Sequence, residues 1–530
     1  MRTSTLRVAG LVTLLIAACG CGGGGTTPTG SASPSQGAAP TILSITPSDA
    51  PAVGGVAATI TGTNFRSGAT VSFGPNAATS VVVVSETTIH CLIPAGSSGT
   101  VAVSVTNSDS TKASLVGAFT YTTAGTGGGG GGNGVSGLPA IVFGFQCGTG
   151  VSTNCPGWTW PKTTAQPGLI RLWDAQVEWS LLNPSVDNYE WKNLDNWLDL
   201  IAQHLPRDVI YTFGWTPCWD ATTCVSTGSI PNGTAAPPKD LNANGSATFN
   251  AFVTALVNHC SAKGNCVKDL IKYWEMWNEP NNAVRWSGTE MQLYQMVAAA
   301  VPIIRSNVSE AQILTPPAAG GDSAWMQTWL SLENSNGRLS DIYSFHLYLL
   351  TGTPEDRFPI IQKMVETKNA APGWALTPWW NTETNFLNVP YYSCATTYSA
   401  NDCTGQVVRW QLLHSSNGAG NLSWYYFDTT IGQNAAYAAA YYQMMKWMVG
   451  SSFTGPCSVN GTLWSCQLTL ANGNAAQILW NTSSSCSNSG CPENVSSTWT
   501  GYQDLSGADV TIVNNTVPVG VMPIMLTSNP

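Results

Sequence analysis

Short, almost continuously apolar runs alternate with amphipathic stretches between residues 138 and 450. The amphipathic stretches, such as 191–205, 247–262 and 290–306, repeat their apolar residues with helical spacing. Continuous apolar runs are typical of strands in a parallel sheet that is buried on both faces. Eight such runs occur, over residues 140–145, 168–174, 208–215, 272–280, 312–318, 341–349, 379–386 and 421–428. Eight β/α units in about 310 residues predict a (β/α)8 TIM barrel over residues 138–450.

The segments on either side of this barrel have a different pattern. Residues 40–122 carry short alternating runs with turn signals about every ten residues, which predicts a β-sandwich. Residues 451–530 return to short alternating runs, so we expect a small C-terminal β-sandwich packed on the barrel. Residues 123–137 contain six consecutive glycines, which indicates a flexible linker and a domain boundary.

The first 18 residues have the pattern of an export signal. Arg2 and Arg7 precede an apolar run that is too short to span a membrane. The run ends in Leu15-Ile-Ala-Ala-Cys19, which resembles the lipoprotein box of bacterial signal peptides. The resemblance implies lipidation of Cys19, with residues 19–39 as a flexible tether; a plain secretory signal is the alternative. We therefore expect a protein anchored by lipid at the bacterial outer membrane or cell surface, or secreted.

Composition and charge narrow the classes of partner. Charged residues make up only 9% of the 530 residues, against about 25% in an average protein. The net charge of −9 argues against nucleic acid as a partner. Tryptophan is abundant, with 22 residues, and indole faces stack well on the apolar faces of sugar rings. Nothing in the sequence implies a metal or a cofactor, and it gives no indication of oligomeric state.

Twelve of the fifteen cysteines are close neighbours in sequence, and no pair has C-x-x-C spacing. With only five histidines, this pattern favours local disulfides over zinc sites, and it indicates an oxidising compartment. The simplest pairs are Cys147 with Cys155, Cys218 with Cys224, Cys260 with Cys266, Cys394 with Cys403, Cys457 with Cys466, and Cys486 with Cys491. Spacing alone does not fix this connectivity. Cys91 is left over and is expected to be a buried free thiol.

Candidate chemistry lies at the ends of two predicted strands. The run Tyr273-Trp-Glu-Met-Trp-Asn-Glu-Pro280 must stop at Pro280, which has no N–H to donate to a sheet. Alternation would place Glu275 and Glu279 on one face of this strand. Glu383 ends the aromatic strand that begins at Trp379. Active sites of these barrels lie at the carboxyl ends of the strands, so Glu279 and Glu383 are expected at one mouth. Two such carboxylates suit glycoside hydrolysis.

Residues 40–122 resemble the immunoglobulin-like IPT/TIG domain. The resemblance rests on the Ile45-Thr-Pro opening, Gly54-Gly55, Ile60-Thr-Gly-Thr-Asn-Phe65, Val71-Ser-Phe-Gly74 and Gly117-Ala-Phe-Thr-Tyr121. It implies a fold and leaves the role open between a spacer and a module that binds a glycan or a protein.

The barrel resembles clan A of the glycoside hydrolases. Trp274-Glu-Met-Trp-Asn-Glu-Pro-Asn281 is similar to the acid/base strand of family 39, and a family 5-like barrel is the close alternative. The segments Tyr502-Gln-Asp-Leu-Ser-Gly507 and 519–526 resemble the β-sandwich that accompanies family 39 barrels. The resemblance implies a retaining hydrolase of a polysaccharide or oligosaccharide.

The resemblance also implies individual roles. Glu279 would be the acid/base and Glu383 the nucleophile, and Asn278 would bind the sugar 2-hydroxyl. The remaining site residues would be Arg171 near Glu383, His346 lining the site, Tyr348 donating to Glu383, Trp424 as the floor, and Trp215 as a sugar platform.

Several alternatives stay open. Arg171 could pair with Glu275 inside the barrel, and His346 could be a satisfied core histidine. Trp215, like Trp219 and Trp286, could serve loop packing, and Glu178 has no assigned role. The whole protein could instead be a non-catalytic glycan binder at the cell surface, or an adhesion lipoprotein that uses the barrel as a scaffold.

Overall fold

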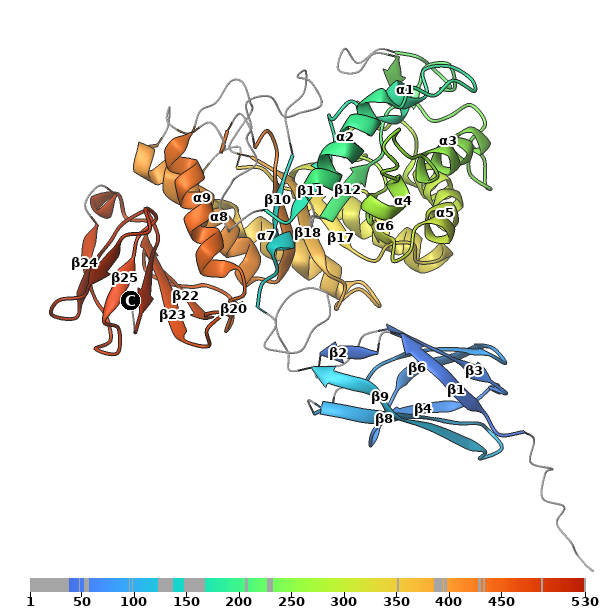
Figure 1. Cartoon of the computed structure of the whole chain (residues 1–530), viewed down its shortest axis with the longest axis horizontal. Coiled ribbons are helices and arrows are strands. Elements are labelled where there is room, and N and C mark those ends of the chain that lie inside the picture. The colour runs from blue at the N-terminus through green and yellow to red at the C-terminus, as the bar shows by residue number, and fades with distance from the viewer. Residues whose placement is uncertain are drawn as a thin grey trace, which may run out of the picture. The chain divides into compact units, whose positions relative to one another are not determined.

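The structure of the chain is a computed structural model. It describes residues 38–46, 48–51, 57–94, 96–97, 99–122, 137–146, 167–204, 208–225, 232–349, 352–385, 394, 398–427, 430–431, 434–487 and 490–528. These residues form two compact units, divided between Tyr121 and Thr122, which are described separately (Figure 1). The export signal, the tether and Cys19 lie outside the described residues. None of the described helices is long and apolar enough to cross a membrane.

The first unit is a β-sandwich of two sheets. One sheet has the order β1-β3-β7-β6 and the other β2-β9-β8-β4-β5. Their bounds are β1 Thr41–Thr46, β2 Asp49–Pro51, β3 Ala57–Thr63, β4 Thr70–Phe73, β5 Asn76–Ala77, β6 Thr79–Ser85, β7 Thr88–Leu92, β8 Gly99–Thr106 and β9 Lys112–Thr122. Alternating residues such as Ile60, Phe73 and Phe119 are fully buried between the sheets. Cys91 is buried and free, as predicted.

The second unit contains the predicted barrel. Its strands are β10 Phe143–Phe145, β11 Leu169–Leu172, β12 Asp208–Thr212, β15 Tyr273–Glu275, β16 Gln312–Leu314, β17 Tyr343–His346, β18 Trp379–Thr384 and β19 Ala419–Trp424. They form one sheet in the order β16-β15-β12-β11-β10-β19-β18-β17. Isolated parallel bridges, Leu314 with Ile342 and Ala318 with Phe345, join the two outer strands. The ring therefore closes, and all eight predicted strands are present.

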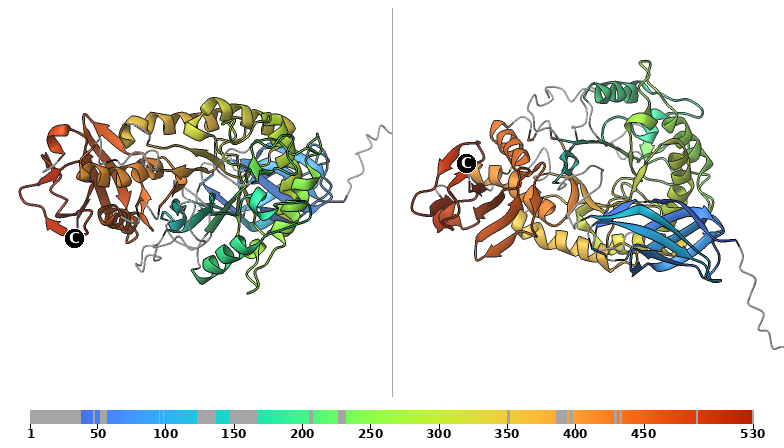
Figure 2. Two further views of the ribbon diagram at one scale, coloured as in Figure 1. Left: turned by 90° about the horizontal axis from the view of Figure 1, so that it is seen from above. Right: turned by 60° about the horizontal axis from the view of Figure 1, so that its bottom comes forward.

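Helices surround these strands in every view (Figures 1 and 2). The longer helices are α2 Lys192–Gln203, α3 Ala247–Val257, α5 Glu290–Asn307, α6 Ser323–Asn336, α7 Pro354–Ala370, α8 Ala400–Ser416 and α9 Ala435–Met448. The short helices α1 Trp179–Leu182 and α4 Val267–Leu270 interrupt two of the connections. Inside the ring, Tyr273 on β15 meets Trp380 on β18 with ring centroids 4.9 Å apart, so the interior is packed and is not a pore.

Several predicted runs, among them 140–145, 208–215, 312–318 and 341–349, are longer than the strands they contain, and the difference is largest for 272–280. The apolar pattern predicts a strand over 272–280, but β15 ends at Glu275. Trp277 has a φ of 112° and Glu279 a φ of 48°, so the chain leaves the extended conformation before the Asn-Glu-Pro motif. The backbone N–H of Trp277 turns back to the carbonyl of Glu275 at 3.0 Å. Simple alternation therefore does not place Glu279 on the same strand face as Glu275.

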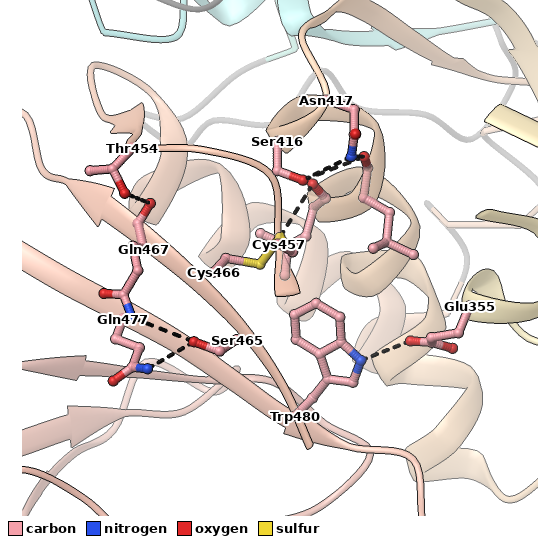
Figure 3. Close-up of a disulfide and its surroundings, with 12 residues drawn as sticks. Glu355, Ser416, Asn417, Thr454, Cys457, Ser465, Cys466, Gln467, Gln477 and Trp480 are labelled. Atoms are coloured by element: carbon pink, nitrogen blue, oxygen red, sulfur yellow. Dashed lines mark hydrogen bonds between the residues drawn. A yellow bond between two sulfur atoms is a disulfide. The ribbon is translucent and has the colours of Figure 1, made fainter. Parts of the chain in front are cut away.

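The C-terminal region is rich in strands, as expected. Its main sheet has the order β20-β22-β23-β28-β25-β26, with β21 paired to β22, and β24 pairs with β27. The bounds are β20 Ser452–Phe453, β21 Ser458–Asn460, β22 Leu463–Thr469, β23 Ala475–Asn481, β24 Cys491–Asn494, β25 Gly501–Gln503, β26 Asp509–Thr511, β27 Thr516–Val519 and β28 Ile524–Thr527. Trp480 of this region donates to Glu355 at the start of α7 at 2.8 Å, which ties the β-region to the barrel (Figure 3).

Five of the six predicted disulfides are present. They join Cys218 to Cys224, Cys260 to Cys266, Cys394 to Cys403, Cys457 to Cys466 and Cys486 to Cys491. The Cys457–Cys466 bridge fixes the hairpin that approaches α8, where Cys457 contacts the carbonyl of Leu412 (Figure 3). Each of the five bridges closes a short loop, as the sequence spacing predicts.

The sixth predicted disulfide is not among the bridges that the structure describes. Cys147 directly follows the described segment 137–146, and Cys155 falls within the same gap, which ends before residue 167. Both cysteines, Cys147 and Cys155, therefore lie outside the described residues. Their pairing rests on sequence spacing alone and stays a prediction.

Candidate active site

The two strand-end glutamates lie at one mouth of the barrel. Glu383 is on β18, one residue before its end, and Glu279 follows β15 by four residues. One carboxylate oxygen of Glu279, one of Glu383 and one ring nitrogen of His346 all lie within 4.8 Å of one another. Glu383 is only 5% exposed. The parallel ring brings these residues together because the carboxyl ends of its strands share one rim.

Arg171 on β11 binds both Glu275 and Glu383. Its Nη1 donates to Oε2 of Glu383 at 2.6 Å and to Oε1 of Gln146 at 2.8 Å. Its Nη2 donates to Oε2 of Glu275 at 2.5 Å and to Oδ1 of Asn278 at 2.7 Å. The two arrangements left open by the sequence therefore occur together. Because Arg171 is fully buried, solvent screens its ion pairs with Glu275 and Glu383 only weakly.

Glu275 is the second anchor of that guanidinium. It is fully buried, and Thr212 donates to its Oε2 at 2.9 Å while Thr382 donates to its Oε1 at 2.5 Å. With these donors and Arg171, the carboxylate has hydrogen bonds on both oxygens, which a buried charge requires. Glu275 thus holds Arg171 from one side while Arg171 reaches Glu383 on the other.

The other oxygen of Glu383 accepts a hydrogen bond from the hydroxyl of Tyr348. Burial and the neighbouring charge of Glu383 raise the pKa of Tyr348 well above its usual value, so the phenol keeps its proton and remains a donor. Glu383 is therefore bonded by a cation on one oxygen and by a neutral donor on the other. Both contacts hold the Glu383 carboxyl in one orientation.

Glu279 has a different environment. Its Oε1 lies 3.0 Å from Nδ1 of His346. Burial raises the pKa of Glu279 above its ordinary value, although the charges of Arg285 and Arg171 oppose this shift. Burial also lowers the pKa of His346 to about 4, so its imidazole is neutral at neutral pH. A single proton then lies between Oε1 of Glu279 and Nδ1 of His346, and Glu279 can hold it.

Asn278 directly precedes Glu279 in the chain and is 1% exposed. Its Oδ1 accepts from Arg171, which fixes the amide orientation and directs the NH2 group away from the guanidinium. An amide nitrogen held in this way is a donor suited to a sugar hydroxyl.

The predicted aromatic residues occupy buried positions. Trp424 ends β19 and is fully buried. Trp215 is 1% exposed and stacks on Trp173 with centroids 6.5 Å apart, so it packs the loop and has no open face in this structure. Trp219 donates to the carbonyl of Asn183, and Trp286 to the carbonyl of Thr289. These contacts favour loop packing over a sugar platform for all three residues after β12 and β15.

Sequence reasoning missed several groups at the mouth. Asp174 follows β11, and its Oδ2 accepts from the hydroxyl of Tyr425, which follows β19, at 2.6 Å. Arg285 lies close enough to lower the pKa of Asp174, although burial raises it overall. Tyr425 directly follows β19 and Asp174 follows β11 by two residues, so a survey of every strand end would have found them. Arg285 lies ten residues beyond β15, and no local signal marks it.

Backbone strain gathers at this rim. Asp174, Trp215, Trp277, Glu279 and Tyr426 all have positive φ, between 48° and 112°, after strands β11, β12, β15 and β19. Such conformations are costly for residues other than glycine and persist only where surrounding structure imposes them. Backbone strain of this kind is common at active sites, which agrees with the position of Glu279 and Glu383 at the same mouth.

Among the described residues, Glu279, His346 and Glu383 are the one cluster with the ligand types and spacing for a metal ion. Arg171 lies 2.6 Å from one oxygen of Glu383, and Tyr348 bonds the other. A second cation there would be repelled by the guanidinium and would have to displace the phenol. The cluster is better suited to proton transfer, and the absence of a cofactor stays a prediction.

Glu178 lies in the turn that follows β11. It is 1% exposed, and neither carboxylate oxygen has a hydrogen-bond partner among the described residues. Burial, helped by the charge of Asp174, raises the pKa of Glu178 to about 8. Glu178 is therefore protonated at neutral pH and supports the turn after β11 without contributing a charge.

Glu178 should make the protein less stable as the pH rises. Its pKa is higher in the folded chain than the ordinary 4.5, so the unfolded chain ionises first and stability falls between about pH 4.5 and 8. The contribution is at most about 1.4 kcal/mol per pH unit. In Glu178→Gln this dependence disappears, and the fall in Tm from pH 5 to pH 8 becomes smaller. Glu310→Gln, at an exposed position, should keep the wild-type slope. An unchanged slope in Glu178→Gln would contradict the assignment.

Comparisons with known proteins agree with this architecture. A family model described as the IPT/TIG domain matches residues 40–122, so the expected resemblance of that segment is confirmed. No curated protein sequence matches the chain. A solved family 39 glycoside hydrolase from the gut symbiont Bacteroides cellulosilyticus WH2 is 14% identical, with a TM-score of 0.53 over 88% of this chain and 96% of that one.

Two further solved structures are more distant. A glucosidase from Croceicoccus marinus is 13% identical, with a TM-score of 0.48 over 72% of this chain and 82% of that one. The catalytic domain of GH30 xylanase C from Talaromyces cellulolyticus is 12% identical, with a TM-score of 0.46 over 74% and 99%. The likeness to the family 39 structure extends over most of both chains. The barrel and its β-region therefore have a glycoside hydrolase fold, as the sequence resemblance implied.

Proposed function

We propose that the protein is a retaining glycoside hydrolase that acts on a polysaccharide or oligosaccharide. The observation that carries the proposal is the approach of Glu279 and Glu383 oxygens to within 4.8 Å. Retaining enzymes hold their two carboxyl groups about 5 Å apart, whereas inverting enzymes need about 6.5–9.5 Å to admit a water between them.

The unequal surroundings of the two carboxyls support separate roles. Glu383 is bonded by Arg171 and Tyr348, which suits an ionised nucleophile. Glu279 is buried beside a neutral histidine, which suits an acid that keeps its proton. In the first step Glu383 attacks the anomeric carbon and forms a glycosyl ester, and the leaving oxygen takes the proton of Glu279. The Asn278 amide would donate to the sugar 2-hydroxyl during this step.

The second step reverses the roles. Once Glu383 is esterified its negative charge is gone, so Glu279 ionises more readily and can take a proton from water. That water attacks the anomeric carbon and Glu383 leaves as a carboxylate, still bonded by Arg171. Two displacements return the sugar with its original anomeric configuration.

The stereochemistry of the first product tests this mechanism. Proton NMR during hydrolysis of an aryl glycoside that the enzyme accepts should show the starting anomer before mutarotation, because two inversions cancel. The spectra must be recorded faster than the product sugar mutarotates. The pure opposite anomer of that sugar, dissolved in the same buffer, gives the rate of mutarotation as the control. Initial appearance of the inverted anomer would exclude Glu383 as a nucleophile. Saturable glycan binding without any product would favour the glycan-binding alternative.

The setting of the enzyme is also a proposal. We infer that the chain is exported and lipidated at Cys19 in the bacterial envelope, with secretion as the alternative. The five disulfides of the described residues support an oxidising compartment. Replacing Cys19 by alanine should move the protein from the membrane fraction to the soluble fraction if lipid is its anchor.

A further inference from the structure

Arg285 is a cation at the mouth that the proposed reaction does not use. It belongs to the loop after β15, and two backbone contacts fix its position. Its N–H donates to the carbonyl of Asn282 at 2.8 Å, and its own carbonyl accepts from the indole of Trp277 at 3.0 Å. The loop that carries Glu279 therefore also sets the position of Arg285.

Two indoles hold the guanidinium in place. Its central carbon lies 5.1 Å from the ring centroid of Trp215 and 5.8 Å from that of Trp173. The two rings are nearly parallel, with an angle of 15° between their planes. Cation–π contacts of this kind position an arginine without using its N–H donors. The buried Trp215 thus acquires a role, since it supports a charged group and is not itself a sugar platform.

The N–H donors of Arg285 have no acceptor among the described residues: the side chain makes no ion pair and no hydrogen bond there. Arg171 is the contrast, because four side chains accept from it. Arg409, another buried arginine, pairs with Glu355 and Asp402. A half-buried guanidinium at the mouth, whose N–H groups meet no acceptor in the part of the chain that the structure describes, is suited to bind a ligand.

Neither nearby carboxyl, that of Asp174 or that of Glu279, forms an ion pair with Arg285 among the described residues. Asp174 already accepts a hydrogen bond from Tyr425, and burial raises its pKa. Glu279 must carry a proton when it acts as acid, and burial raises its pKa as well. The positive charge of Arg285 therefore has no direct ion-pair partner among the described residues. This local charge contrasts with the net charge of −9 on the whole chain.

We propose that Arg285 binds an anionic group of the substrate, a carboxylate or a sulfate on the sugar beside Glu279, so that the enzyme acts on an acidic glycan. A planar guanidinium matches both groups because its paired N–H donors form two parallel hydrogen bonds with two oxygens. This inference rests on the proposed glycoside hydrolase function and names the class of glycan that the site accepts.

Binding by the inactive full-length Glu383→Gln chain tests the inference. Native affinity electrophoresis would use three sets of polymer: polygalacturonate, alginate and hyaluronan for carboxylates; carrageenan for sulfate; glucomannan, arabinoxylan and xyloglucan as neutral glycans. We expect retardation by at least one acidic polymer and by none of the neutral ones. Retardation by the carboxylate polymers would indicate that Arg285 binds a carboxylate, and retardation by carrageenan that it binds a sulfate.

The second variant adds Arg285→Met to Glu383→Gln. Loss of a charge-assisted pair should weaken binding of the acidic polymer by about tenfold or more. Arg285→Lys should restore part of the affinity, since lysine keeps the charge but loses the planar fork. Arg305→Met removes the same charge from the exposed surface of α5 and should leave binding unchanged. Thermal unfolding of every variant shows whether the loop change disturbs the fold.

Three outcomes would overturn the inference: binding of neutral polymers as tight as that of acidic ones, full binding by the Arg285→Met variant, or binding of no acidic polymer. An assay for reducing ends released by the wild-type chain distinguishes the hydrolase proposal from the acidic-glycan inference. Hydrolysis of neutral polymers only would contradict the acidic-glycan inference and agree with the hydrolase proposal. Binding of an acidic polymer that depends on Arg285 but yields no product would contradict the hydrolase proposal alone.

Discussion

Replacing Glu383 by glutamine should reduce kcat on an activated aryl glycoside by about 10⁴-fold or more, as expected when the nucleophile of a catalytic unit is removed. The change keeps the shape of the side chain but removes the negative charge that attacks the anomeric carbon. Arg171 would retain its ion pair with Glu275 at 2.5 Å, so the buried guanidinium keeps a counter-charge and the fold should survive. Steady-state rates with the aryl glycoside, alongside thermal unfolding, measure both effects.

Glu310→Gln is the matched control for this variant. Its side chain is 76% exposed and pairs only with Lys272 among the described residues, so the same chemical change should leave kcat within about twofold of the wild-type value. Near-full activity in Glu383→Gln would remove the nucleophile from the mechanism. An equal loss of kcat in Glu310→Gln would show that the rates reflect differences between protein preparations and not removal of the nucleophile.

The amino-acid pattern predicts the positions of the eight barrel strands because each strand is buried on both faces and reads as an apolar run. Glu279 and Glu383 can be placed at one mouth because parallel strands end together. Spacing in the sequence also favours the local disulfides, since sequence separations of six and nine residues bring Cys218 to Cys224 and Cys394 to Cys403. These features depend on local periodicity or on the topology of the ring, both of which a single sequence carries.

Other features depend on geometry that periodicity does not contain. The pattern overestimates the extent of β15 because residues after Glu275 remain apolar while their backbone adopts positive φ at Trp277 and Glu279. The double pairing of Arg171 requires the register of β11 against β15 and β18, which the sequence does not specify. Asp174 and Arg285 approach Glu279 only through loop conformation. The sequence therefore indicates the two carboxylates and Arg171, whereas the positions of Asp174 and Arg285 depend on the folded loops.

The position of Arg171 supports the separate roles proposed for Glu279 and Glu383. Its guanidinium lies between Glu275 and Glu383, at 2.5 and 2.6 Å, so one buried cation serves two carboxylates. Glu275 takes no part in the proposed reaction and keeps its ion pair with Arg171, whereas Glu383 alternates between carboxylate and ester. Arg171 is thus never left without a partner during the proposed cycle, which avoids the cost of an unpaired buried charge when the ester forms.

Replacing Glu279 by glutamine should have the second largest effect, and its size should depend on the leaving group. A glycoside with a poor leaving group needs the proton and should lose about 10²- to 10⁴-fold in kcat/KM. A 2,4-dinitrophenyl glycoside leaves without protonation, so kcat/KM should change little. Deglycosylation then becomes slow because no base activates water, and added azide should restore turnover by forming a glycosyl azide. Glu310→Gln should lose no activity on either substrate.

The pH profile gives an independent check of the same assignment. The acid form of Glu279 is required in the first step, so kcat/KM of the wild-type enzyme should fall as the pH rises through the pKa of Glu279. Burial places that pKa above the ordinary 4.5, which moves the fall toward neutral pH. In Glu279→Gln no proton is lost at this position, so the alkaline fall should disappear.

Equal losses on both leaving groups, together with an unchanged alkaline limb, would mean that another group supplies the proton. His346 is the nearest alternative donor, with Nδ1 3.0 Å from Glu279. Burial lowers the pKa of its imidazole to about 4, so at neutral pH it carries no imidazolium proton to give. Its neutral ring can position Glu279 but cannot replace it as the acid, which is why the loss in Glu279→Gln should be large on a poor leaving group.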